Sequence, residues 1–235
     1  MSQLLGLFIT GTDTGVGKTY VAAGVIRALR RRGLRVGAYK PAVSGSRAEP
    51  QGPVWDDLDT LQAALGQEVP IERISPQRFA APCAPPVAAW LEGRQVDAAL
   101  LRNGIDWWRG KAEVIIVEGA GGLLSPLSDS DLVADVASDL GFPLVIVARL
   151  SLGTINQTLM TVEVARTRGL PIAGIVLNRP AALDPHDRSA ETNPRELAAR
   201  CDVPILAILP YEPDAALLQI SPLFTIDWME LAYRR

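Results

Sequence analysis

One segment of nine residues, GTDTGVGKT at 11–19, restricts the fold of this chain more than any other. The apolar run at 4–10 before it has the length and composition of a buried strand. After it, residues 18–32 place apolar side chains at helical spacing, and Gly33 ends that pattern. A glycine-rich turn that joins a buried strand to a helix is the usual setting of a phosphate-binding loop, so we predict one here.

The residue types in this loop suit a bound phosphate chain. Its glycines let the backbone turn, so that N–H groups of Gly15, Val16 and Gly17 can point inward at phosphate oxygens. The N-terminal end of the following helix adds partial positive charge at the same place. Lys18 would neutralise the outer phosphates, and the Thr19 hydroxyl would be a ligand of Mg²⁺. The loop therefore predicts a site for ATP and its metal ion.

The loop departs at one position from the common pattern G-x-x-x-x-G-K-[ST]. That pattern places a glycine at position 12, where this chain has Thr12, and the loop opens one residue earlier at Gly11. The alternative interpretation is a glycine-rich turn that binds no nucleotide. The strand before the loop and the helix after it favour phosphate binding.

Short apolar runs alternate with amphipathic stretches along the rest of the chain, as in a parallel sheet with crossover helices. We expect strands at 4–10, 35–40, 113–118, 143–148, 171–177 and 204–209. We expect helices at 18–32, 57–65, 97–109 and 154–168, a long loop at 41–53, irregular structure at 75–90 and a surface loop at 179–193. The predicted fold class is α/β: one P-loop NTPase-like domain over 1–235, with a parallel sheet flanked by helices on both faces.

Composition argues against several classes of protein. The net charge is −3, and the basic block at 30–32 is interpreted as a solvated helix end rather than a nucleic-acid site. Cys83 and Cys201 are too few for a disulfide scaffold or a cysteine metal centre, and the single histidine, His186, argues against a histidine-dependent triad. No leader is recognisable, and no run reaches the roughly 18 apolar residues of a membrane span. We expect a cytoplasmic protein that binds neither nucleic acid nor membrane.

Residues that follow the strands are candidates for the site, because parallel sheets place ligands beyond the carboxyl ends of their strands. Glu118 ends the run EVIIVE and could face a metal ion from across the sheet, or be an ordinary solvated strand end. Lys40 ends the second strand, near the phosphate loop, although taken alone it resembles a surface lysine. Asp56, Asp57 and Asp59 could each approach Mg²⁺ or cap a helix, and their spacing does not choose between them.

Two further strand ends carry polar residues. The segment SLGT at 151–154, with Asn156, begins a helix whose free N–H groups suit a substrate carboxylate. A plain helix cap would explain the same residues. Asn178 follows the run IAGIVL and could bind an adenine edge with its amide, or act as a turn residue.

Four blocks occur in a specific order along the chain: GTDTGVGKT at 11–19, KPAVSG at 40–45, VEGAGG at 117–122 and LGTIN at 152–156. Together they resemble the dethiobiotin synthetases, and the longer phosphate loop that opens at Gly11 is that family's form. The similarity extends over about residues 4–210 and is strong in the blocks and weak between them. Phosphate loops occur in many families, whereas the four blocks together are specific.

The resemblance implies an enzyme of biotin synthesis that joins 7,8-diaminononanoate and CO₂ into a cyclic urea at the expense of ATP. One amine takes up CO₂ as a carbamate, and the γ-phosphoryl group of ATP is transferred to that carbamate. The second amine then attacks the mixed anhydride and releases phosphate. The resemblance also implies Mg²⁺ as cofactor and a homodimer.

The same resemblance assigns catalytic and substrate-binding roles. Lys40 would hold the carbamate and the transferring phosphoryl group, and Lys18 would be the second catalytic cation. Ser44 would form a hydrogen bond nearby. The substrate carboxylate would bind, from the partner subunit, to Gly153, Thr154 and Asn156.

The nucleotide and its metal ion would take the other residues of the site. Thr14 would contact the phosphates with Lys18, and Asn178 would bind adenine. Mg²⁺ would be held by Thr19, Asp57 and Glu118, so the resemblance selects Asp57 from the aspartate cluster.

Some positions depart from the family's usual residues. Gln157 follows Asn156 where the family often has histidine, and Val87 follows Pro86 where histidine is also frequent. The segment 179–193 matches nothing recognisable. These departures affect the substrate side of the predicted site and leave the phosphate loop unchanged.

Two other functions remain as alternatives. Cobyrinic acid amide synthases share the fold group, but they usually carry a glutamine amidotransferase domain for which this chain is too short. Partitioning ATPases bind DNA or membrane and typically have an extra lysine early in the loop, where this chain has Gly11 and Thr12. The sequence favours the synthetase.

Overall fold

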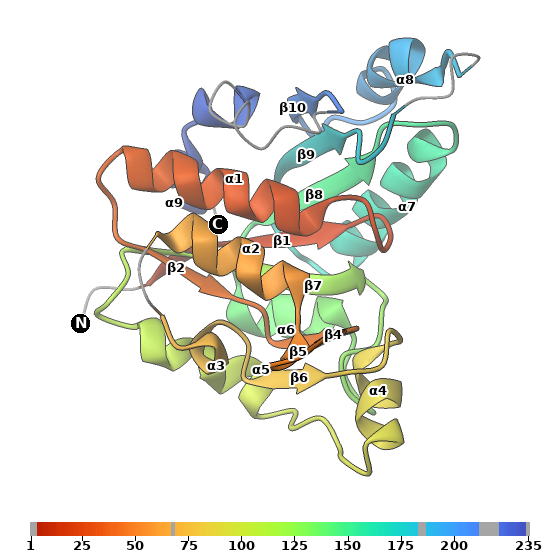
Figure 1. Ribbon diagram of the computed structural model, residues 1–235. Coiled ribbons are helices and arrows are strands. Elements are labelled where there is room, and N and C mark those ends of the chain that lie inside the picture. Colours follow the sequence, from red (N-terminus) through yellow and green to blue (C-terminus); the bar gives the residue numbers. More distant parts are fainter. Residues whose placement is uncertain (1–3, 67–68, 183–186, 212–220, 234–235) are drawn as a thin grey trace.

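Six parallel strands form the central sheet of the computed structural model, which describes residues 4–66, 69–182, 187–211 and 221–233 (Figure 1). Most of their side chains are buried, as expected where helices cover both faces of a parallel sheet. In spatial order the strands are β10 (Ile205–Leu209), β9 (Ile172–Asn178), β8 (Leu144–Arg149), β1 (Leu5–Gly11), β7 (Val114–Gly122) and β2 (Val36–Tyr39).

Helices α1 (Lys18–Arg31) and α2 (Asp56–Leu65) pack side by side on one face of the sheet, in front of it in Figure 1. Helices α6 (Val133–Leu140) and α7 (Thr154–Thr167) lie on the other face, because right-handed crossovers put them there when strands are added on the other side of β1. The remaining helical elements are α3 (Ile71–Ile74), α4 (Pro85–Leu91), α5 (Leu100–Asn103), η1 (Gly104–Trp108), α8 (Ser189–Ala198), η3 (Pro222–Phe224) and α9 (Trp228–Tyr233).

This arrangement confirms the predicted α/β class with a parallel sheet between helical layers. The six expected strands all form, and their carboxyl ends meet at one edge of the sheet. None of the described helices is long and apolar enough to cross a membrane. That residues 1–235 form a single domain stays a prediction.

The prediction of a long loop at 41–53 is wrong, because three short strands lie there. Strand β3 (Ala42–Ser44) pairs in parallel with β6 (Gln77–Phe79), and β4 (Arg47–Glu49) forms a hairpin with β5 (Gly52–Val54). Each strand has only three residues, too few to show an alternating pattern, and the pairing of β3 joins segments far apart in the sequence. Tertiary pairing, not local propensity, makes these strands.

The prediction of irregular structure at 75–90 is also wrong, because the segment contains β6 and helix α4. Pro85 and Pro86 suggested a break in structure, but they occupy the first turn of the helix. Proline is tolerated there because the backbone N–H that it lacks would have no partner within the helix.

Two expected elements have other bounds. The helix expected at 97–109 is reduced to α5 and the 3₁₀ turn η1, where the Tyr39 hydroxyl donates to the Leu100 carbonyl at 2.7 Å and the Tyr39 ring packs against Gly104. The strand expected at 113–118 continues to Gly122, so Glu118 lies within β7 rather than at its end.

Two helices lie in segments whose sequences have no clear apolar pattern. Helix α6 was not expected, and α8 begins inside the segment 179–193, which was predicted to be a surface loop. Residues 183–186 of that segment, with His186 among them, lie outside the described residues.

Candidate active site

The phosphate loop connects β1 to the first turn of α1, as predicted. Gly17 caps the helix with φ of 96°, in the left-handed region that favours glycine, and a Cβ there would lie 2.0 Å from Nδ2 of Asn178. At Gly11 a Cβ would lie 3.0 Å from Nζ of Lys18. The Asp13 carbonyl oxygen would be closer still, at 2.8 Å, so the loop leaves no room for a side chain at position 11.

Lys18 is the first residue of α1 and is buried, with 7% of its surface exposed. Its Nζ donates to the backbone carbonyl of Asp13 at 2.9 Å, and the N–H of Thr14 donates to the Asp13 carboxylate at 2.6 Å. Burial lowers the pKa of Lys18, although the negative charge of Glu118 acts in the opposite direction. The loop is thus held by its own hydrogen bonds around a poorly solvated cation.

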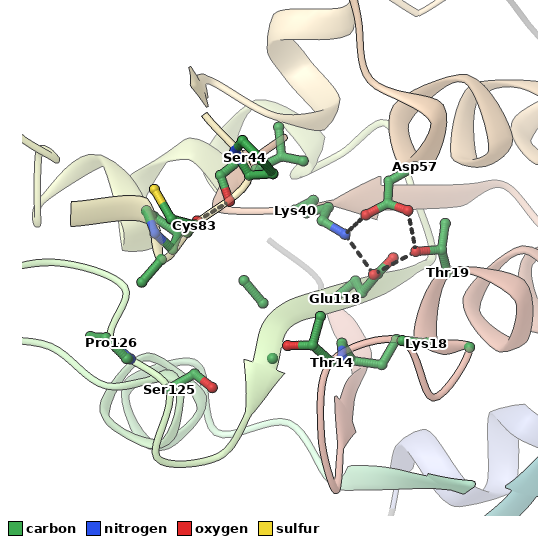
Figure 2. Close-up of a pocket in the computed structure, with 18 residues that line it drawn as sticks. Thr14, Lys18, Thr19, Lys40, Ser44, Asp57, Cys83, Glu118, Ser125 and Pro126 are labelled. Carbon is green, nitrogen blue, oxygen red and sulfur yellow. Dashed lines mark hydrogen bonds and ion pairs between the residues drawn. The ribbon is translucent and has the colours of Figure 1, made fainter. Parts of the chain in front are cut away.

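Four side chains from four segments meet beside the loop (Figure 2). Lys40, which follows β2, places its Nζ 2.5 Å from Oδ2 of Asp57 and 2.6 Å from Oε1 of Glu118. The Thr19 hydroxyl lies 2.9 Å from Oδ1 of Asp57 and 2.8 Å from the same Oε1 of Glu118. Lys40 and Glu118 are almost fully buried. The structure therefore brings together four of the residues predicted for catalysis and metal binding.

Burial and ion pairing oppose each other in this group of side chains. Burial alone would lower the pKa of Lys40, but the charges of Glu118 and Asp57 and the hydrogen bonds to them raise it above its ordinary value. Burial alone would raise the pKa of Asp57, but the charge and hydrogen bond of Lys40 lower it. For Glu118 burial is the larger effect and raises the pKa. Glu118 thus depends on a neighbouring cation to carry its negative charge.

The donor set of this group fits a magnesium ion. Thr19, Asp57 and Glu118 supply only oxygen atoms, which Mg²⁺ prefers, and Mg²⁺ usually completes its shell with water and phosphate. Oε2 of Glu118 is buried and has no hydrogen-bond partner among the residues that the structure describes. Within the described ranges no three His, Cys, Asp or Glu side chains gather as a metal site, so the Thr19 hydroxyl and nucleotide phosphates would have to complete the shell.

A cavity of about 640 Å³ opens over the phosphate loop and these four side chains. Its volume lies within the range of small-molecule sites. The lining residues come from the loop, from the ends of β2 and β7 and from the segments that follow them. They are Thr14, Gly15, Gly17, Lys18, Thr19, Lys40, Val43, Ser44, Asp57, Pro82, Cys83, Ala84, Pro85, Glu118, Ala120, Gly121, Ser125 and Pro126.

The outer wall of this cavity includes residues that the sequence analysis missed. The segment 82–85 lines it, and the Ser44 hydroxyl donates to the Cys83 carbonyl at 2.5 Å (Figure 2). Ser125 also lines it and accepts a hydrogen bond from the N–H of Gly122. The proline-rich composition of the segment was the available signal, but it indicated only irregular backbone. Ser44 was predicted from the resemblance and does lie in the cavity wall.

Asn178 lies at a second, smaller cavity of about 150 Å³. Its Nδ2 donates to the Val16 carbonyl at 2.8 Å, so the amide oxygen is not used in that bond. Gly17, Tyr20, Pro180 and Tyr211 are among the residues that surround it. The predicted adenine-binding residue thus lies directly behind the phosphate loop. Val16 itself is buried and contributes only its backbone.

The three residues predicted at the start of α7 do not line either cavity. Gly153 caps the helix with φ of 93°, Thr154 is buried, and the Asn156 amide contacts Sδ of Met160. Within this one chain they are separate from the phosphate site, so their role as ligands of a substrate carboxylate stays a prediction.

Comparisons of the sequence place these motifs in a family. A family model described as an AAA domain matches residues 5–216. A protein of Anaeromyxobacter dehalogenans, named ATP-dependent dethiobiotin synthetase BioD, is 48% identical over 212 residues, which cover 90% of this chain and 92% of that protein. The protein of the same name from Bacillus subtilis is 43% identical over 206 residues, 87% of each chain.

Solved structures support the fold alone. The septum site-determining protein MinD of Pyrococcus horikoshii, solved with Mg-ADP, superposes with a TM-score of 0.54 at 20% identity and covers 97% of this chain and 89% of that chain. A ParA family ATPase of Chlorobium tepidum superposes with a TM-score of 0.53 at 18% identity, with coverages of 95% and 90%. The central sheet and its phosphate loop therefore belong to a fold that is shared by ATPases of different function.

Proposed function

This chain belongs to the family of ATP-dependent dethiobiotin synthetases, and from this membership we propose that its larger cavity is where ATP drives the closure of a diamine and CO₂ into a cyclic urea. The substrate is 7,8-diaminononanoate, and the enzyme is a ligase of biotin synthesis. The sequence similarity that supports this covers about nine tenths of the chain.

One observation carries the assignment of the cavity to this chemistry: Lys18 and Lys40 lie at one cavity with two carboxylates and the Thr19 hydroxyl. Phosphoryl transfer needs positioned groups and positive charge more than it needs a covalent catalyst. A site with two buried cations and no histidine among its lining residues suits that demand.

The reaction has three bond-forming steps. A nitrogen of one amine attacks the carbon of CO₂ and loses a proton, which gives a carbamate. A carbamate oxygen then attacks the γ-phosphorus, the bond from that phosphorus to the bridging oxygen breaks, and ADP leaves. Finally the nitrogen of the second amine attacks the carbonyl carbon of the mixed anhydride and loses a proton, the bond from that carbon to the phosphate oxygen breaks, and phosphate leaves as the ring closes.

Each lysine acts at a different point in this sequence. Lys18 holds the outer phosphates together with the backbone of Gly15, Val16 and Gly17, and Thr14 bonds to them from the loop. Lys40 faces the carbamate and the phosphoryl group in transfer, where negative charge moves during the reaction. Lys40 and Ser44 both line the larger cavity, which supports this role.

The metal ion and the base of ATP have separate places. Thr19, Asp57 and Glu118 would hold Mg²⁺, which when bound supplies positive charge to the phosphate chain. The Asn178 amide binds adenine in the smaller cavity. Its position next to Gly17, at the start of α1, supports this assignment.

We also propose that the protein is a cytoplasmic homodimer. In it, Gly153, Thr154 and Asn156 of one subunit bind the substrate carboxylate in the cavity of the other. Their position outside the cavities of their own chain supports this proposal. The homodimer is expected to bind neither nucleic acid nor membrane.

Mass spectrometry of the products tests the function. Purified protein is mixed with 7,8-diaminononanoate, bicarbonate, ATP and Mg²⁺, and we expect the cyclic urea with one ADP per ring, and neither product when the diamine is omitted. Lys40→Ala should lower kcat by about 10²–10³-fold, as the loss of one charge-stabilising group does. Lys111→Ala is the matched control, because Lys111 lies outside the cavity and bonds to the Trp107 carbonyl. ADP without the urea, or ATP hydrolysis stimulated by DNA or lipid, would contradict the proposal.

A further inference from the structure

The Lys40 ammonium group occupies a place that does not match the role proposed for it. That role requires it to face the carbamate, but in the structure it lies between Asp57 and Glu118, 2.5 Å and 2.6 Å from one oxygen of each (Figure 2). These are the two carboxylates proposed to hold Mg²⁺. A cation of the protein therefore lies against the proposed metal ligands.

The carboxylates need such a cation when no metal is bound. Both approach the Thr19 hydroxyl, which has one proton and can donate to only one of them at a time. The Glu118 side chain is 1% exposed, so its charge is almost cut off from water. Two uncompensated carboxylates in such a place would repel each other and carry a large desolvation cost. The ammonium group of Lys40 offsets both effects.

The backbone of Lys40 is held in place, while its side chain borders the cavity. The backbone N–H of Lys40 donates to the Ile74 carbonyl at 2.7 Å, which holds the main chain at the end of β2. The four-carbon side chain lines the same cavity as Ser44, so a turn of Nζ from the carboxylates toward the cavity would involve rotation about its own bonds. Lys18 differs, because its Nζ is bonded to the backbone carbonyl of Asp13.

Lysine rather than arginine stands at position 40, although the chain has only three lysines among its 23 basic residues, at 18, 40 and 111. A guanidinium group would bind a carboxylate with two parallel hydrogen bonds and would be harder to release than an ammonium group. Lysine is the cation that suits a position where the charge must move.

We propose that Lys40 is an exchangeable counter-cation. Without nucleotide its ammonium group holds Asp57 and Glu118 together as a preformed metal site. When Mg²⁺ and ATP bind, Lys40 leaves the carboxylates and turns to the carbamate and γ-phosphate. Metal loading and the delivery of the catalytic lysine are then one event. This inference rests on the proposed site roles, and its test is independent of catalysis.

Binding of Mn²⁺, a spectroscopically visible substitute for Mg²⁺, tests the exchange in the absence of nucleotide. Free Mn²⁺ is measured by electron paramagnetic resonance. Lys40→Met should bind Mn²⁺ about tenfold or more tightly than the wild type, because a competing positive charge is gone. Lys40→Arg should bind it about tenfold more weakly, because the guanidinium holds the carboxylates in two bonds. Lys111→Met is the matched control, with a change below about threefold, since Lys111 lies outside the cavity and bonds to the Trp107 carbonyl.

Unchanged or weaker Mn²⁺ binding by Lys40→Met would overturn the proposal. If that variant does not fold, the wild type still gives an answer through NMR of its side-chain ammonium groups. With only three lysines, Lys111→Arg and Lys18→Arg suffice to assign the signals. Addition of Mg²⁺ and ADP should shift the Lys40 signal, and a Lys40 signal that does not change on saturation would also overturn the proposal. A protein that forms no cyclic urea but shows the exchange would contradict only the proposed function.

Discussion

Two strand–helix junctions lie side by side at the carboxyl edge of the sheet, and their backbones are alike. One joins β1 to α1 and the other joins the neighbouring strand β8 to α7. Both helices have 14 residues, and both are capped by a glycine in the left-handed region, Gly17 with φ of 96° and Gly153 with φ of 93°. Each junction also has a threonine in the first helical turn, Thr19 or Thr154.

Their surroundings are not alike. A Cβ on Gly17 would meet the Asn178 amide at 2.0 Å, whereas nothing lies within 4 Å of a Cβ on Gly153. The Thr19 hydroxyl is bonded to the carboxylates, whereas the buried Thr154 hydroxyl has no hydrogen-bond partner among the described residues. The first junction is thus completed by other segments of its own chain. The second is contacted by α8, where the Asn193 amide donates to the Ser151 carbonyl at 2.9 Å, but it lines neither of the two cavities.

This difference shows that the local conformation of a glycine-capped helix does not by itself make a binding site. At the first junction, β2, α2 and β7 bring a lysine and two carboxylates to the helix start. At the second, Gly153, Thr154 and Asn156 line neither cavity, which is why we propose that this junction acts across a subunit interface. Matched substitutions at the two junctions test this comparison.

The largest expected effect is on ATP binding. Lys18→Ala removes the cation of the phosphate loop, and we expect a loss of affinity of about a thousandfold, since truncating one partner of a buried charge pair costs several kcal/mol. Asn156→Ala at the other junction should leave ATP affinity unchanged and raise KM for the diamine. Calorimetry with ATP and steady-state kinetics separate the two results. ATP binding retained in Lys18→Ala would remove the distinction between the junctions.

The next effect is on stability. Gly17→Ala should lower the free energy of unfolding by about 2–3 kcal/mol, because it adds left-handed strain to a clash with the buried Asn178 amide. Gly153→Ala has the strain without the clash and should cost about 1 kcal/mol. Urea denaturation of both variants measures the difference, and equal losses would show that the surroundings of Gly17 do not matter.

A smaller effect is expected at the two threonines. Thr19→Val removes the hydroxyl that, among the described residues, bonds the carboxylate pair, and it should cost about 1–3 kcal/mol. Thr154→Val replaces an unbonded buried hydroxyl by a methyl group of similar shape and should change stability by less than about 0.5 kcal/mol. Thermal unfolding without ligands gives both values. A large loss in Thr154→Val would mean that its hydroxyl has a partner in solution.

The smallest expected effect is the pH dependence of the stability that the lysines of the first junction contribute. Burial lowers the pKa of Lys18, while the neighbouring carboxylates raise the pKa of Lys40 despite its burial. Stability from the Lys40 ion pairs is therefore present below the ordinary lysine pKa and is lost as pH rises through the raised value. The contribution of Lys18 to stability changes with pH in the opposite direction. Its burial cost is relieved as pH rises from its lowered pKa to the ordinary one. An NMR titration should show Lys18 losing its proton at lower pH than Lys40, and the reverse order would contradict both directions.

The sequence analysis located the first junction well and its partners only in part. The phosphate loop was evident because strand, loop and helix are contiguous, and its glycine and lysine positions follow from local geometry. Lys40 taken alone resembled a surface lysine. The spacing of the aspartates at 56–59 did not show which of them would bind the metal ion. The resemblance to a family selected Asp57, and the structure shows it bonded to both Thr19 and Lys40.

The elements that were not predicted from the sequence have a common cause. Strands β3 and β6 pair across more than thirty residues, and the cavity wall at 82–85 lies beside Ser44 because of that pairing. Neither segment has a periodic pattern of its own. Pro85 and Pro86 predicted irregular backbone because their place in a helical first turn is not visible until the helix is known.

The local sequence was enough to predict the six strands of the central sheet, helices α1, α2 and α7 and the phosphate loop, because apolar periodicity and glycine conformation act over a few neighbouring residues. Only the tertiary structure shows that Lys40 lies between two carboxylates, that Gly17 is backed by Asn178 and that the start of α7 lies outside both cavities. These facts depend on contacts between residues up to 162 positions apart. Such contacts are set by how the sheet is ordered and packed, and no local pattern encodes them.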